Sequence, residues 1–98
     1  MQRPSRAPHG SAPGEVRARL RALPRALGYP TQTAFAHAMG VGISRWNMTI
    51  MTGVIGKPLA FELYRRIPGM RIEWLFFGDR TAMPGPLLAK IDEAAASD

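Results

Sequence analysis

One short stretch, residues 32–46, restricts most strongly what this chain can fold into. Its pattern predicts two short helices joined by a glycine turn. Ala36 is a small residue where two steeply crossing helices must touch, and Gly40 permits a sharp reversal because glycine adopts a left-handed backbone without strain. Trp46 is large enough to anchor the second helix in a core and so to hold the opposite face outward. The spacing therefore predicts a helix-turn-helix pair.

Apolar residues recur at helical spacing on both sides of this pair. The predicted helices are about 14–27, 32–39, 43–51, 58–67 and 71–77. Beyond Gly78 the pattern weakens, and it does not decide whether a sixth helix forms over about 86–96. Pro24 removes one backbone hydrogen bond from the first helix, at a cost of about 3 kcal/mol in a helix interior, so this helix is expected to kink or break near Leu23.

The helical spacing also separates buried from exposed positions. On the first helix, Arg17, Arg21 and Arg25 are expected on the solvent side. Thr31 is expected to cap the start of the second helix. The residues expected to face the core are Val16, Leu20, Leu23, Leu27, Phe35, Ala36, Met39, Trp46, Ile50, Leu59, Leu63, Ile67, Ile72, Leu75 and Phe76.

The size and composition indicate one small all-α domain. The chain has 98 residues, of which 46% are hydrophobic, and this suffices for a compact core. It has no cysteine, which excludes a disulfide framework and a cysteine zinc site. Prolines, glycine and serines predict a flexible basic tail over 1–13. The helix-turn-helix domain is then expected over 14–80, followed by a C-terminal extension over 81–98.

The sequence contains no membrane or export signal. No segment approaches the roughly 18 apolar residues of a membrane span. The N-terminus carries Arg3 and Arg6 but lacks the apolar stretch of a signal peptide. A cytoplasmic protein without a membrane partner is therefore expected.

The chain is basic and its charge is uneven. The formal net charge is +6. Residues 1–30 carry six arginines and one glutamate, whereas residues 81–98 carry one lysine and three acidic residues. A basic body makes a polyanionic partner plausible, and the alternative is ordinary solvated charge on an arginine-rich protein.

With Trp46 inside, five residues of the helix 43–51 are expected on or beside its outer face, and their chemistry suits the DNA major groove. Arg45 can donate paired hydrogen bonds to guanine, and Asn47 can pair in the same way with adenine. Arg45 can instead bind a phosphate, which adds affinity without specificity. The five residues are Ile43, Ser44, Arg45, Asn47 and Met48.

The remaining members of this set differ in what they can contact. Ser44 can bond a base or a phosphate, while Ile43 and Met48 offer only apolar contact, for instance with a thymine methyl group. Gln32 stands where it can bond a phosphate together with free backbone N–H groups, and Thr33 beside it is included in the same predicted site. Lys57, in the expected loop after the helix 43–51, can bind a phosphate further along. Plain solvent exposure is the alternative for each polar residue.

With these elements in order, the chain resembles the Cro/C1-type helix-turn-helix family, the lambda-repressor-like domains, over about 14–80. The resemblance is carried by the runs 28–32 (Gly-Tyr-Pro-Thr-Gln), 36–46 and 67–79 (Ile-Pro-Gly-Met-Arg-Ile-Glu-Trp-Leu-Phe-Phe-Gly-Asp). It implies a five-helix fold whose third helix reads double-stranded DNA. It also implies a sequence-specific operator and a homodimer, in a transcription regulator of bacterial or phage type. The run 49–52, Thr-Ile-Met-Thr, is more apolar than in many members.

A second function remains open: a protein-interaction module that keeps this fold without specific DNA reading. Ile43, Met48, Ile50 and Met51 would then form an apolar patch for a partner, and methionines suit an adaptable interface. Alternatively, Ile50 and Met51 belong to the core and Met48 alone is exposed.

An enzyme is not expected. His37 has no nucleophile or metal partner nearby in the sequence, and Glu62 and Glu73 lack a spacing suited to acid–base work. The loop 53–56 lacks the lysine and hydroxyl pair of a phosphate-binding loop. No cofactor, metal or small-molecule ligand is therefore expected.

Overall fold

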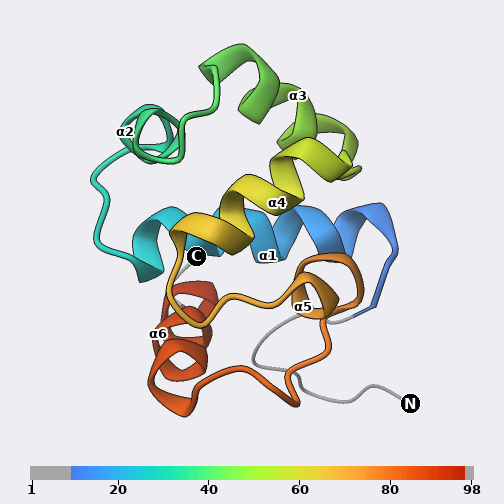
Figure 1. Ribbon diagram of the computed structural model, residues 1–98, viewed down its shortest axis with the longest axis vertical. Coiled ribbons are helices and arrows are strands. Elements are labelled where there is room, and N and C mark those ends of the chain that lie inside the picture. The colour runs from blue at the N-terminus through green and yellow to red at the C-terminus, as the bar shows by residue number, and fades with distance from the viewer. Residues whose placement is uncertain (1–9, 97–98) are drawn as a thin grey trace.

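The computed structural model describes residues 10–96, which form six helices and no strands (Figure 1). The helices are α1 (Pro13–Ala26), α2 (Gln32–Ala38), α3 (Ile43–Thr52), α4 (Lys57–Arg66), α5 (Ile72–Phe77) and α6 (Gly85–Ala96). The prediction of an all-helical chain is confirmed, and each helix begins and ends within one residue of its expected position. The sixth helix, which the sequence left open, is present.

Helix α1 organises the molecule. It packs against α6, α3 and α5, and in Figure 1 α2 and α3 lie toward one end of the molecule while α6 lies at the other. The Cα radius of gyration is 12.4 Å, close to the value of about 13 Å for a compact domain of this length. The residues predicted to face the core are buried, except for four that pack against it half-buried: Leu27, Ile50, Ile72 and Phe76.

The residues that directly precede α1 are bonded to the end of α5. Most of the predicted tail falls outside the described residues. At its end, the Gly10 N–H donates to the Phe77 carbonyl at 2.8 Å, and the helix already begins at Pro13. The last residues before α1 are therefore tied to the rest of the domain.

Of the two outcomes expected near Leu23, a kink or a break of α1, the break is wrong. The helix continues through Pro24 to Ala26, and the Leu27 N–H still donates to the Leu23 carbonyl at 3.0 Å. Pro24 lies in the last turn, so its ring disrupts the ladder only near its end, and the ring is buried in the core. Burial of this apolar ring offsets the loss of one hydrogen bond.

The described part of the C-terminal extension, residues 81–96, does not stand apart from the core. On α6, Leu87, Ile91 and Ala94 are buried in the same cluster as the residues of α1. Polar contacts reinforce this packing: Arg25 donates to the Ala94 carbonyl at 3.1 Å, and both terminal nitrogens of Arg80 donate to the Asp92 carboxylate, at 2.9 and 2.8 Å.

Like Arg25, two further arginines of α1 form hydrogen bonds with other helices. Arg17, expected on the solvent side, donates from Nε to the Ile50 carbonyl at 2.9 Å and from Nη2 to the Met51 carbonyl at 3.1 Å. Arg19 is 1% exposed, donates to the Leu75 carbonyl at 3.1 Å and lies 5.8 Å from the centre of the Trp74 ring. Burial lowers the pKa of Arg19, and the nearby Glu15 carboxylate opposes that shift.

Arg17 thus satisfies two carbonyls at the C-terminal end of α3, which carries the negative end of the helix dipole. We expect Arg17→Ala to lower the free energy of unfolding by about 1–2 kcal/mol, because charge-assisted hydrogen bonds are lost. Urea denaturation followed by circular dichroism measures this. Arg21→Ala is the matched control, since Arg21 is exposed on the same helix. Equal midpoints for the two variants would contradict the capping role.

Candidate functional site

Helices α2 and α3 are held together by an aromatic cluster. Trp46 is fully buried, its ring centre lies 5.1 Å from that of Phe35, and Phe35 lies 5.4 Å from Tyr29. Between the helices, Gly40 has a φ of +71°, and the Val41 N–H donates to the Ala36 carbonyl at 2.9 Å. The expectations that Trp46 is anchored inside and that a left-handed glycine makes the turn are both confirmed.

A side-chain hydrogen bond sets the rotation of α3 against α2. The Trp46 indole N–H donates to Oε1 of Gln32, the first residue of α2, at 2.5 Å. Thr31 caps the same helix as expected, since its Oγ1 accepts from the Ala34 N–H at 3.0 Å. Gln32 is half-buried, and with its carbonyl oxygen engaged, its amide NH2 group is the part left to donate to a ligand.

The buried indole leaves the opposite face of α3 in solvent. Of the predicted site residues on this helix, Ser44, Arg45, Asn47 and Met48 are exposed, while Ile43 is half-buried against the core. Successive residues of an α-helix are rotated by about 100°. Ser44 and Met48 therefore lie near the middle of the exposed arc, and Arg45 and Asn47 lie on its two flanks.

The hydroxyls of α3 that the sequence did not single out are already engaged within the helix. Thr49 is buried and its Oγ1 donates to the Arg45 carbonyl at 3.0 Å, while Thr52 donates to the Met48 carbonyl at 2.9 Å. Met51 is also exposed, so the alternative in which it belongs to the core is wrong. One turn beyond Met48, Met51 extends the apolar middle of the outer face, which we call the α3 face: Ser44, Arg45, Asn47, Met48 and Met51.

The surroundings of the α3 face carry no negative charge from α2 or α3. No Asp or Glu occurs in the sequence between Glu15 and Glu62, a signal that could have been found from the sequence. Within residues 10–96, the side chains of Arg45 and Lys57 are exposed and make no hydrogen bond or ion pair. Their positive charges are therefore available to an anion.

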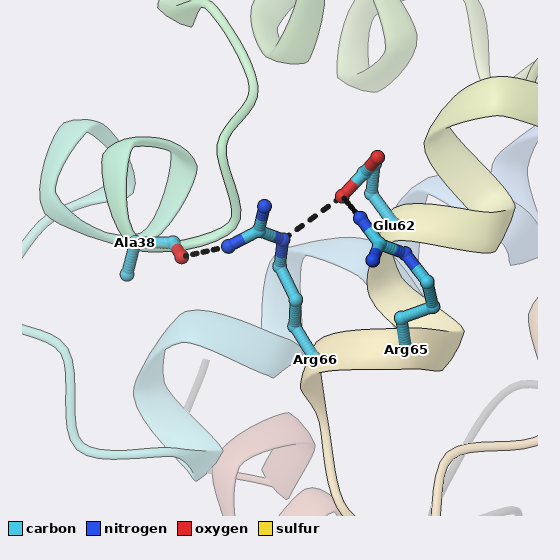
Figure 2. A network of polar contacts seen from close by, with 4 residues as sticks. All are labelled: Ala38, Glu62, Arg65 and Arg66. Atoms are coloured by element: carbon cyan, nitrogen blue, oxygen red, sulfur yellow. Dashed lines mark hydrogen bonds and ion pairs between the residues drawn. The ribbon is translucent and has the colours of Figure 1, made fainter.

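Two arginines near the end of α4 are engaged in ion pairs, unlike Lys57 at its start. Arg65 and Arg66 both donate to Glu62 Oε1 at 2.9 Å, and hydrogen bonds from Arg66 and then Arg65 lower the pKa of Glu62. Figure 2 shows Arg66 between Glu62 and the Ala38 carbonyl at the end of α2, which it approaches at 3.5 Å. A Cβ on Gly40 would lie 2.9 Å from the Arg66 guanidinium, so this side chain closes over the turn between α2 and α3.

The other two predicted site residues lie on the helices before and after α3. Thr33 is exposed on the first turn of α2. Lys57 is not in a loop but is the first residue of α4, because Pro58 suits a first helical turn, where its missing N–H costs nothing. Both are exposed, as solvent contact or a bound phosphate would require.

The described residues offer little for other kinds of chemistry. Among residues 10–96, no three His, Asp or Glu side chains gather closely enough to hold a metal ion, and none of the helices has the length and apolar character to cross a membrane. One open hollow of about 420 Å³ has mostly apolar walls and no catalytic pair of side chains. Its walls are formed by Leu27, Ile67, Pro68, Gly69, Pro84, Pro86, Leu87 and Lys90.

Comparisons of this chain with protein-family models, with curated proteins and with solved structures found no match.

Proposed function

We propose that this chain binds double-stranded DNA in a sequence-specific manner, with α3 in the major groove, and acts as a transcription regulator of bacterial or phage type. The observation that carries the proposal is the full burial of Trp46, which presents Arg45 and Asn47 to solvent on a helix free of acidic residues. A recognition helix needs this arrangement: one face locked into the domain and the other able to reach base edges.

The residues divide into base-reading and phosphate-binding groups. Arg45 suits a guanine and Asn47 an adenine, and their places on opposite flanks of the α3 face assign them to different base pairs. Met48 suits a thymine methyl group, and half-buried Ile43 contributes only its exposed part. The amide NH2 of Gln32, with Thr33 and Lys57, suits phosphates on either side of the groove.

A homodimer forms part of this proposal. Two copies of α3 would read half-sites about 34 Å apart, one helical turn of DNA, on a two-fold symmetric site. Selection of bound sequences from a random DNA pool at physiological salt tests both statements together. We expect enrichment of a symmetric site, and a pool that stays random would contradict specific reading.

We expect Arg45→Ala to weaken binding to the selected site by about 5- to 150-fold, since one bidentate base contact is worth about 1–3 kcal/mol. Arg21→Ala removes the same charge from α1 and serves as control. If Arg45 binds a phosphate instead, the slope of log affinity against log salt falls by about 0.9 in magnitude and base preference is unchanged. Equal affinities for the two variants would contradict a role of α3 in DNA binding.

One observation favours a second function, that of a protein-interaction module. Met48, Met51 and Val54 are 57%, 69% and 64% exposed, and the neighbouring apolar side chains of Met48 and Met51 on α3 also suit a protein partner. The same DNA selection separates the two functions. A protein-interaction module would show only weak, salt-sensitive retention with no enriched sequence.

A further inference from the structure

Among the described residues, the methionines that are exposed to solvent lie on one helix. The chain has six methionines and no cysteine. Met39, Met70 and Met83 are at most 6% exposed, whereas Met48 is 57% and Met51 is 69% exposed. The two exposed methionines both belong to α3, and the three buried ones lie in the core.

Met48 and Met51 also share one face of that helix. Residues three apart are neighbours on a helix surface, so the two thioethers lie beside each other in the middle of the α3 face. Both are more than half exposed to solvent. A small polar oxidant therefore reaches them without any opening of the fold, while it reaches Met39, Met70 and Met83 only when the core opens.

We propose that Met48 and Met51 form an oxidation site for peroxides, and that their oxidation weakens the DNA binding proposed above. In each step the thioether sulfur attacks one peroxide oxygen and the O–O bond breaks. The sulfur is oxidised by two electrons to the sulfoxide, and hydrogen peroxide is reduced to water, which takes up the remaining oxygen and both protons. Methionine sulfoxide reductases reverse this modification in general.

The effect on binding, which rests on the proposed function, follows from the change in polarity. A sulfoxide is polar and chiral, whereas a thioether is apolar and flexible. A sulfoxide at position 48 brings a hydrated oxygen to the place where a thymine methyl group would sit, and that oxygen must lose water without gaining a donor. The chain has no thiol to compete for the oxidant, so among the methionines of residues 10–96 those of α3 are oxidised first.

The modification is tested on the full chain with hydrogen peroxide, tryptic digestion and mass spectrometry. We expect the peptide that contains Met48 and Met51 to gain one oxygen per methionine about tenfold faster than the peptides with Met39, Met70 or Met83, because oxidation follows exposure. In urea the difference should disappear. Equal rates in the folded protein would overturn the proposal.

The functional effect is tested with the variant Met48→Leu/Met51→Leu, which keeps the apolar volume and removes the sulfur. After peroxide treatment we expect the affinity of the original chain for its selected DNA site to fall by about tenfold, the size of one base contact, and that of the variant to stay constant. An equal loss in both proteins, or none in the original chain, would overturn the link to binding. Absence of selective binding before treatment would refute the proposed function instead, and the oxidation rates would still test the modification site.

Discussion

Replacement of Trp46 by alanine is expected to lower the free energy of unfolding by about 3–5 kcal/mol, because it removes a large, fully buried ring and leaves a cavity. Domains of this kind are stable by about 5–15 kcal/mol in total, so the variant loses a large share of its stability. Urea denaturation followed by circular dichroism measures the change. A loss below about 1 kcal/mol would contradict the anchoring of α3 through this residue.

The second tryptophan supplies a matched comparison. Trp74 is also fully buried, but its indole N–H finds no acceptor within residues 10–96, whereas that of Trp46 donates to Gln32. Trp46→Phe removes a hydrogen bond, while Trp74→Phe removes a buried donor without a partner. We therefore expect Trp46→Phe to cost about 1 kcal/mol more than Trp74→Phe. The reverse order would show that the bond to Gln32 contributes nothing.

Gly53→Ala is expected to lower the free energy of unfolding by about 3 kcal/mol or more, because overpacking adds to backbone strain. Gly53 ends α3 with a φ of +70°, a backbone conformation that strains any residue type with a Cβ. A Cβ there would also lie 2.7 Å from the Cα of Pro13, and this neighbour is backbone, which cannot turn away as a side chain can. Either the end of α3 or the start of α1 must move. The midpoint of urea denaturation reports the loss.

Two other glycines separate the contributions. Gly28 has a φ of +83° but open space around its Cβ position, so Gly28→Ala should cost only the backbone strain, about 1 kcal/mol. Gly14 lies within α1 with open space and an ordinary φ, so Gly14→Ala should stabilise the protein by about 0.5 kcal/mol. A Gly53 variant no less stable than the Gly28 variant would contradict the close contact between α1 and α3.

Much of the candidate site could be predicted from the sequence, because it depends on one helix and one anchor. The buried position of Trp46 and the helical repeat together determine that Arg45, Asn47 and Met48 are exposed. The same repeat places Met51 beside Met48 on the exposed side, so the alternative that assigned Met51 to the core could also have been rejected from the sequence. The predicted start at residue 58 left Lys57 one residue outside the helix that it begins, because helix boundaries are the least certain part of a pattern.

Local signals determined the helices of this protein, because a helix needs only its own repeat, a cap such as Thr31 and a left-handed glycine such as Gly40. Tertiary structure alone decided which arginines are buried or bonded. Arg17, Arg19 and Arg25 bond carbonyls 33, 56 and 69 residues away. A helical repeat predicts only the face of the helix on which an arginine lies. Whether a carbonyl without a backbone donor lies near that face depends on how distant helix ends pack. The residues next to the arginine in the sequence carry no information about this packing.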